Sequence, residues 1–315
     1  MHIRDGILGP EVCVIGGALA VAAVGYSLRR LRTELADRAI PLTGMLAAVI
    51  FAGQMVNFPL FGLPVSGHLL GGVLAAVVLG PWAGCVALSL VLVVQAILFA
   101  DGGLLSLGVN IVNMAVIGAW GGGAAYQFLR RFLGSGRQPT LFAAIIAAYL
   151  SVLAAAGLFC LEFAYTRTNA AFDLRQISVW MLLYHALIAV GEAGITGAVV
   201  AFLLARRPEL ILRETTPIEP SRFRSAAWGL GLTAAVVAMV ASPWASGWPD
   251  GLEAVAERAG FNTLGMDRPL LLSDYALPLP SGWDAISVSL AGLLGTIVVL
   301  CLGWGLSRWL QRATP

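Results

Sequence analysis

Residues 68–101 read HLLGGVLAAVVLGPWAGCVALSLVLVVQAILFAD, and no charged residue lies between His68 and Asp101. A transmembrane helix needs about 20 apolar residues to cross roughly 30 Å of hydrocarbon. The stretch is longer than one crossing, so it is expected to form a short piece at 68–79 and a full span at 82–100. We predict that both pieces cross a membrane, with neighbouring helices covering the ends of the short one.

The rest of the chain has the same apolar character. Its 315 residues are 59% hydrophobic and only 11% charged, with a mean hydropathy of +0.86, whereas soluble domains are about 25% charged. The chain is therefore predicted to be an all-α integral membrane protein with about nine transmembrane helices. Beside the two pieces above, spans are expected near 8–28, 40–58, 107–129, 140–164, 177–205, 224–242 and 285–307. We predict that the first is a retained helix, since its apolar run is too long for a signal peptide.

The positions of the arginines orient these helices. All nineteen basic residues are Arg, and an outside N-terminus places most of them in inside loops, as the positive-inside rule requires. Omitting the short piece would invert every helix after it. The predicted topology has the N-terminus outside and the C-terminus in the cytoplasm. The inside arginines would be Arg29, Arg30, Arg32, Arg38, Arg130, Arg131, Arg137, Arg206, Arg207, Arg213, Arg222, Arg308 and Arg312.

A charged, proline-bearing segment, RRPELILRETTPIEPSRFR, begins at Arg206 and separates the first seven helices from the last two. We predict a seven-helix domain at 1–205, a cytoplasmic linker at 206–223 and a two-helix module at 224–315. The last two helices would be joined by a long outside loop.

The chain opens MHIRDG, and this topology puts Met1 and His2 outside. Methionine aminopeptidases require a small second residue, so the mature chain is expected to keep Met-His. The Met1 amine, the His2 amide nitrogen and His2 Nδ1 can then bind one ion, and His68 on the same side can add a fourth nitrogen. Four nitrogens in a plane favour Ni(II) or Cu(II), and their deprotonation makes binding pH-dependent. The competing interpretation is a terminal histidine without a role.

Several polar residues accompany the predicted spans, where polar groups are costly and often functional. They could form a second shell or cavity lining around the ion, or only hydrogen bonds between helices. These candidates are Asp5, Gln95, Asp101, Asn110 and Asn113. His185 and Glu192 share one helical face and are open to the same two interpretations, with His185 also a candidate extra ligand.

The sequence lacks the motifs that several classes of function require. The chain contains no Lys, so a phosphate-binding G-x-x-x-x-G-K-[ST] loop cannot form. No H-E-x-x-H motif is present, and the four cysteines contain no C-x-x-C pair. We therefore expect a transport component rather than an enzyme, whose energy would come from partner proteins or from an ion gradient and not from an ATP site of its own.

Several blocks resemble the substrate-capture component of nickel and cobalt energy-coupling-factor transporters. They are MHIRDGIL at the start, SGHLLGG at 66–72, LGPWAG at 79–84, QAILFADGGLLSLGVNIVNMAVIG at 95–118 and HALIAVGEAGITG at 185–197. The resemblance covers about residues 1–205 and implies that Met1, His2 and His68 form the metal site. One departure is Arg4, where the family commonly has proline.

The outside loop of the second module contains PDGLE at 249–253, which is similar to the signature of the small two-helix accessory component of these transporters. The resemblance implies a helper in metal loading. Asp250 and Glu253 are interpreted either as loop structure or as transient metal contacts.

The resulting hypothesis is the substrate-specific membrane component of an ATP-driven importer in a bacterial plasma membrane. The transported substrate would be Ni(II), with Co(II) as the alternative, and no organic cofactor is expected. The resemblance implies as partners a transmembrane coupling component and a pair of ATPase subunits, and no nucleic acid. The alternatives are a cobalt importer feeding cobalamin synthesis and a gradient-driven secondary metal carrier.

Overall fold

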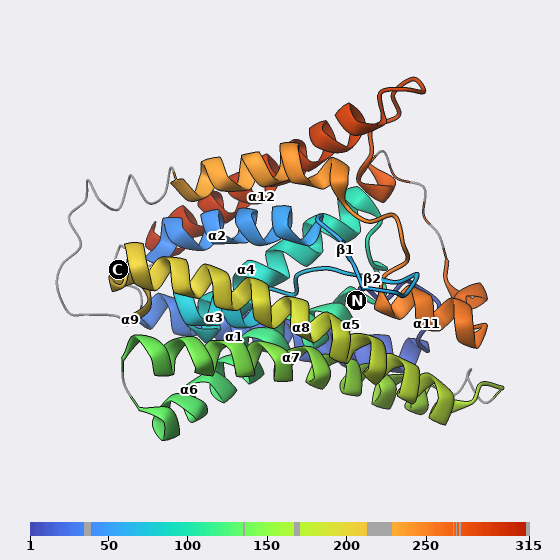
Figure 1. Ribbon diagram of the computed structural model, residues 1–315, viewed down its shortest axis with the longest axis horizontal. Helices are drawn as coiled ribbons and strands as arrows, with labels where there is room; N and C mark the ends of the chain where they lie inside the picture. Colours follow the sequence, from blue (N-terminus) through green and yellow to red (C-terminus); the bar gives the residue numbers. More distant parts are fainter. Residues whose placement is uncertain are drawn as a thin grey trace.

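The computed structural model describes residues 1–34, 39–134, 136–166, 171–212, 229–266, 268, 270 and 272–312. The long helices run along the longest axis of the molecule, with α9 at one end and α11 at the other (Figure 1). Among these described residues, six helices are long and apolar enough to cross a membrane. They are Pro10–Arg32, Pro81–Phe99, Leu107–Leu133, Arg137–Tyr165, Leu174–Arg206 and Asp284–Leu310, and shorter apolar helices lie at Leu42–Gln54 and Gly229–Trp244.

These spans confirm the predicted all-α membrane architecture, while the count of nine crossings and the N-outside orientation stay predictions. Element by element, the first part of the chain contains α1 (Pro10–Glu34), α2 (Ala39–Gln54), α3 (Gly72–Leu79), α4 (Pro81–Val94), α5 (Leu107–Asn110), α6 (Gly122–Leu133), α7 (Arg137–Tyr165), α8 (Leu174–Arg206) and α9 (Glu209–Leu212). The π-helical segments η1 (Gln95–Phe99) and η2 (Ile111–Gly121) continue α4 and α5. From residue 213 on, the predicted linker lies outside the described residues.

The short piece at 68–79 is helical only over α3. Residues Gly72 to Val78 are all buried, and a side chain at Gly72 would overlap the backbone of Gly118 in η2. Eight residues of α-helix extend only about 12 Å, so α3 depends on the surrounding helices for cover. A tight turn at Gly80, with φ +92°, then leads directly into Pro81 at the start of α4.

The chain before α3 contains the small sheet. Strands β1 (Phe58–Pro59) and β2 (Ser66–Gly67) pair antiparallel. Pro249 and Trp248, from the loop of the predicted accessory module, continue this pairing: Ser66 N donates to Pro249 O at 2.8 Å, and Ser66 Oγ donates to Trp248 O at 2.7 Å. The loop is thereby joined to the backbone next to His68.

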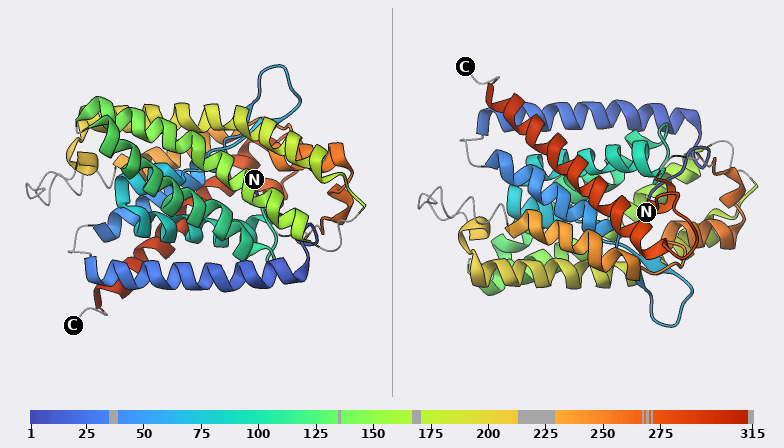
Figure 2. Two further views of the ribbon diagram at one scale, coloured as in Figure 1. Left: turned by 90° about the horizontal axis from the view of Figure 1, so that it is seen from below. Right: turned by 90° about the horizontal axis from the view of Figure 1, so that it is seen from above.

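The remaining elements of the accessory module are η4 (Val237–Ala241), η5 (Ser242–Trp244), α11 (Gly251–Ala259), η6 (Asn262–Leu264), η7 (Ser273–Tyr275) and α12 (Asp284–Arg312). Helix α12 crosses α2 at a close contact of Gly303 with Gly44, where a side chain would overlap the facing backbone (Figure 2). Helix α11 lies on α8, with the Arg258 guanidinium 3.7 Å from the centre of the Trp180 ring. The two predicted domains are therefore packed together along the helices and at the loop end.

Candidate metal-binding site

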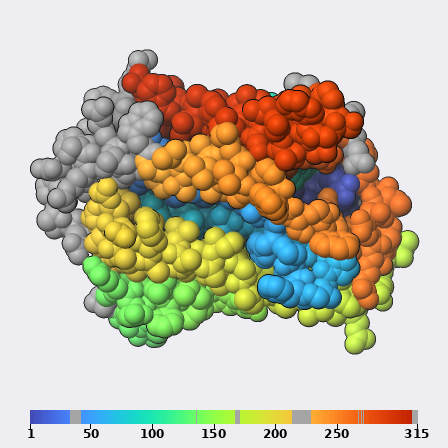
Figure 3. Space-filling view, turned by 45° about the horizontal axis from the view of Figure 1, so that its top comes forward, coloured from blue at the N-terminus to red at the C-terminus, as the bar shows by residue number. Residues whose placement is uncertain are grey.

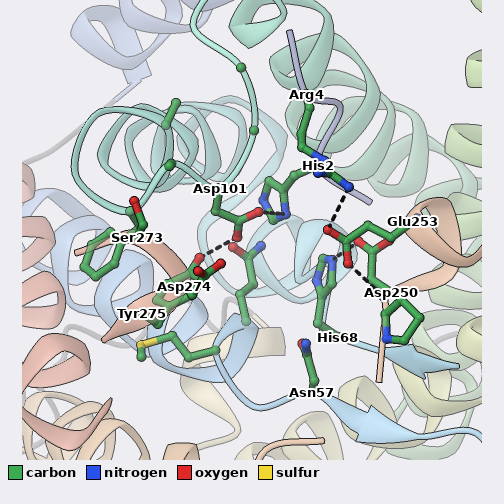
Figure 4. A pocket seen from close by; sticks show the side chains of 18 of the residues that line it. His2, Arg4, Asn57, His68, Asp101, Asp250, Glu253, Ser273, Asp274 and Tyr275 are labelled. Carbon is green, nitrogen blue, oxygen red and sulfur yellow. Dashed lines mark hydrogen bonds and ion pairs between the residues drawn. The ribbon is translucent and has the colours of Figure 1, made fainter. Parts of the chain in front are cut away.

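A cavity of about 740 Å³ opens where the N-terminal segment meets the loops of the accessory module. In the space-filling view the N-terminal residues, dark blue, lie in a hollow between the orange and red parts of that module (Figure 3). The polar side chains that line the cavity, most of them drawn in Figure 4, are His2, Arg4, Asp5, Gln54, Asn57, His68, Asp101, Ser246, Asp250, Glu253, Arg268, Ser273, Asp274 and Tyr275.

The first residues of the chain are fixed by hydrogen bonds to the segment after η1. Ile3 N donates to Asn110 Oδ1 at 2.8 Å, and Asn110 Nδ2 donates to Ile3 O at 3.0 Å. The buried Asp5 carboxylate accepts the backbone N–H groups of residues 104–106 and pairs with Arg268 Nη2 at 3.2 Å. Asn110 and Asp5 therefore hold the N-terminus in the site without facing the Met1 amine themselves.

One ring nitrogen of His68 bonds to a backbone carbonyl, and the other faces the terminal amine. Its Nδ1 lies 3.0 Å from Leu69 O, so Nδ1 carries the proton and donates it. Its Nε2 faces the Met1 nitrogen at 2.5 Å and Asp250 Oδ2 at 3.7 Å. A metal-binding histidine commonly donates its second ring N–H to a carbonyl in this way.

Glu192 holds the backbone that follows His68. Its carboxylate accepts Leu70 N at 2.6 Å and Gly71 N at 2.9 Å. Gln54 Nε2 donates to Leu70 O at 3.0 Å. Glu192 thus positions His68 through the main chain and is not part of the cavity.

His2 differs from the sequence prediction in the direction of its ring nitrogens. Nδ1, predicted to complete the chelate, lies 3.0 Å from Asp101 Oδ1, and Nε2 lies 3.1 Å from Gln95 Oε1. Both partners are acceptors, so a doubly protonated ring satisfies this arrangement. The ring stacks on that of His68 with a centroid distance of 5.1 Å.

Asp250 contributes to the site with one oxygen and to local structure with the other. Oδ2 pairs with the Met1 nitrogen at 2.8 Å, while Oδ1 accepts Glu253 N at 2.9 Å and caps α11. Glu253 completes the capping box and pairs with Arg4 Nη2 at 3.5 Å. The loop interpretation of PDGLE holds for both residues, and Asp250 in addition touches the chain terminus.

The charges of the site shift several pKa values. Burial lowers the pKa of His68, and the nearby terminal ammonium lowers it further. Burial opposes ionisation of Asp101, but the charge of His2 and hydrogen bonds from His2 and Tyr275 outweigh it and lower the pKa to about 2. Burial likewise opposes ionisation of Asp250, yet the terminal ammonium and His68 hold its pKa well below the usual value. Both carboxylates are therefore anions facing the cavity.

The pKa values of two other groups that line the cavity, Glu253 and Tyr275, are raised instead. The charge of Asp250, and then burial, raise the pKa of Glu253. Burial and the charge of Asp101 raise the pKa of Tyr275, so its hydroxyl keeps its proton and donates to Asp101 Oδ2 at 2.5 Å.

Two candidates from the sequence lie apart from the cavity. Asn113, expected as a second-shell or cavity residue, instead donates from Nδ2 to Glu162 Oε2 at 2.7 Å, on α7. His185 Nδ1 donates to Met181 O at 2.8 Å within α8, although the ring touches Gly251 closely enough that a side chain there would clash. The interhelical interpretation fits Asn113, and a structural role fits His185.

Sequence reasoning missed Gln54 and Tyr275. Gln54 Oε1 accepts from Gln95 Nε2 at 2.9 Å, and Tyr275 oxygen accepts from the same nitrogen at 3.0 Å. Gln54 could have been noticed in the sequence as a polar residue within the predicted span 40–58. Within the parts of the chain that the structure describes, no three His, Cys, Asp or Glu side chains are grouped to hold a metal ion.

Comparison with known proteins gives two family matches. Residues 2–210 match the family described as the cobalt uptake substrate-specific transmembrane region, and residues 224–312 match the PDGLE domain. A relative from Archaeoglobus fulgidus, provisionally named fused nickel transport protein NikMN, is 35% identical over 99% of this chain and 100% of its own length. The fused nickel transport protein NikMN of Rhodobacter capsulatus is 31% identical over 100% of this chain and 99% of its own length.

A solved structure supports the fold of the first part of the chain. It is described as the crystal structure of a truncated transition metal transporter and is 30% identical, with a TM-score of 0.55. The match covers 65% of this chain and 99% of that chain.

Proposed function

Because the chain belongs to the family of the cobalt uptake substrate-specific transmembrane region, we propose that it captures Ni(II) outside the cell for import, through Met1, His2 and His68. The observation that carries this proposal is the 2.5 Å approach of the buried Met1 nitrogen to His68 Nε2. The two nitrogens belong to residues 67 positions apart in the sequence, and they face one point. Once the amine loses its proton, both present lone pairs there.

His2 supplies the other two nitrogens of the proposed ligand set, its backbone amide and Nδ1. Gln95 Oε1 accepts the Nε2 proton, which reserves Nδ1 for the ion. The ion takes the place of the proton now directed at Asp101, so the ring must leave its contact with that carboxylate. Asp101 and Asp250 remain close by as anions and attract a divalent cation electrostatically.

Nickel is the favoured substrate on two grounds. A planar set of four nitrogens suits Ni(II). The family whose description mentions cobalt uptake matches only residues 2–210. The two relatives named above match nearly the whole chain, and both are named as nickel transport proteins. Cobalt remains the competing cargo, in a component that would serve cobalamin synthesis.

We further propose that import requires a separate membrane coupling component and two ATPase subunits. The absence of lysine from the sequence removes the phosphate-binding loop that an ATP site of this chain would need. A gradient-driven carrier is the alternative, with His185 and Glu192 as a proton relay. The hydrogen bonds of His185 to Met181 O and of Glu192 to two backbone amides favour a structural role for both instead.

The test is metal binding by the purified full chain, with its Met1 start verified by mass spectrometry. A variant with two alanines inserted before Met1 keeps every helix but moves the amine out of the chelate. A single alanine would not serve, because the resulting Ala-Met-His start offers an amine, two amide nitrogens and an imidazole as a planar nickel site of its own. We expect one yellow, diamagnetic Ni(II) per native chain, weaker Co(II) binding, and loss of this complex in the variant. Equal binding by both proteins would refute the terminal chelate, and tighter Co(II) binding would change the cargo.

A further inference from the structure

Tyr275 closes a ring of hydrogen bonds around His2. Its hydroxyl donates to Asp101 Oδ2 at 2.5 Å, and Asp101 Oδ1 lies 3.0 Å from His2 Nδ1. On the other side of the imidazole, His2 Nε2 lies 3.1 Å from Gln95 Oε1, and Gln95 Nε2 donates back to the Tyr275 oxygen at 3.0 Å. His2, Gln95 and Asp101 belong to the predicted capture domain, and Tyr275 comes from the accessory module; Figure 4 shows His2, Asp101 and Tyr275.

The direction of each hydrogen bond in this ring follows from the chemistry of the groups. The Asp101 carboxylate only accepts, so the Tyr275 hydroxyl must donate to it. The Tyr275 oxygen then has only lone pairs left for Gln95, so Gln95 must turn its NH₂ group toward Tyr275. The amide oxygen of Gln95 is thereby directed at His2 Nε2, which must carry a proton.

These hydrogen-bond directions decide which ring nitrogen of a neutral His2 has a lone pair for the ion. A neutral imidazole with its proton on Nε2 has its lone pair on Nδ1, the atom that closes a chelate ring with the His2 amide nitrogen. Gln54 fixes the Gln95 amide in the same orientation, because Gln54 Oε1 accepts the other N–H of Gln95 at 2.9 Å. Outer hydrogen-bond partners of this kind set the tautomer and orientation of metal-binding histidines.

Tyr275 is held in place for this contact. Its ring stacks on Phe99 with a centroid distance of 4.7 Å and an interplanar angle of 21°. Its backbone and that of Asp274 both have φ +56°, the left-handed region that residues other than glycine rarely adopt. Such conformations persist where the surrounding structure enforces them, commonly at functional sites.

We propose that Tyr275 of the accessory module is a positioning residue for the metal site. Its hydroxyl, directed by Asp101, orients the Gln95 amide so that the proton of His2 stays on Nε2 when Nδ1 gives up its own proton and its contact with Asp101 to bind the ion. The inference rests on the proposed function, since its last link is the binding of an ion at His2. It assigns the module a specific contribution to affinity, made by a side chain outside the PDGLE signature.

The test measures Ni(II) affinity of the purified full chain and of Tyr275→Phe, which keeps the stacked ring and removes only the hydroxyl. We expect about tenfold weaker binding, at the low end of the 10–100-fold effect of outer-shell partners. Tyr126→Phe is the matched control, because Tyr126 is buried in α6, outside the cavity. It should bind as the native chain does.

A double substitution separates positioning from a general structural role. In Asp101→Asn the new amide can donate to the Tyr275 oxygen, which removes the constraint that Tyr275 places on Gln95 and leaves that of Gln54. Adding Tyr275→Phe to Asp101→Asn should then change the affinity less than threefold, whereas independent effects would multiply. Native affinity in Tyr275→Phe, or multiplied effects in the pair, overturns the inference and leaves the terminal chelate standing. Native-like Ni(II) binding by the chain with two alanines before Met1 overturns both proposals.

Discussion

Replacing Glu192 by leucine removes the carboxylate that holds the backbone after His68. Leu70 N and Gly71 N, which donate to it at 2.6 and 2.9 Å, then lose their acceptors in a buried environment. Each buried donor left unsatisfied costs about 1–3 kcal/mol, so we expect a loss of about 2–6 kcal/mol in the free energy of unfolding. Glu192→Gln keeps one acceptor oxygen, so its loss should be about half as large.

The same change should weaken metal binding without touching a ligand. Leu69 O orients the His68 ring through Nδ1, and this carbonyl directly precedes the two amides that Glu192 holds. We expect Ni(II) affinity to fall about 10–100-fold in Glu192→Leu, as for other supports of metal-binding histidines. Thermal unfolding in detergent and calorimetric titration with Ni(II) measure the two effects on the same preparation.

The matched control is Glu257→Gln on the exposed side of α11, which should leave both quantities unchanged. The rival role for Glu192, a proton relay, makes a different prediction. A relay residue could be replaced by leucine with native stability and native Ni(II) affinity, while transport alone is lost. That combination of results would refute the support of His68 by Glu192.

Two further substitutions test the site and the packing. His185→Ala should keep Ni(II) affinity within about threefold, whereas His68→Ala should lower it more than about 100-fold, since outer supports alone account for up to that factor; equal losses would place His185 among the ligands. Gly303→Val should destabilise the chain by about 1–3 kcal/mol through overpacking against Gly44. Gly305→Val on the same helix, where a side chain meets nothing within 4 Å, is the control, and equal thermal unfolding of the two variants would contradict this contact.

The fold was predictable wherever length and polarity alone decide it. Each long apolar run became a helix near its expected limits, because hydrocarbon leaves the backbone few other ways to satisfy its hydrogen bonds. The piece at 68–79 shows the limit of this argument. Its first four residues are not helical, because Glu192 and Gln54 from other helices satisfy the backbone of Leu70 and Gly71 instead.

The candidate site was predictable where a residue type has few other uses in such a chain. With three histidines in the sequence, His2 and His68 were evident, and the structure brings them together with Met1. Of the two interpretations of Asn113, its bond to Glu162 fits the interhelical one, because sharing a helical face with Asn110 does not decide which neighbour it meets. Tyr275 gave no signal, since its partners Asp101 and Gln95 lie 174 and 180 residues away.

The accessory loop meets the chelate from two sides. Asp250 Oδ2 pairs with the Met1 amine, and Tyr275 reaches Asp101, which faces His2. Without these residues the buried terminal ammonium would lose its counter-ion, and an unpaired buried charge is costly. The loop therefore stabilises the ion-free site, and a capture domain without it must balance the charge of its amine by another group. On this argument the accessory module belongs to the proposed metal site, which would give a physical reason for the two predicted domains to occur in one chain.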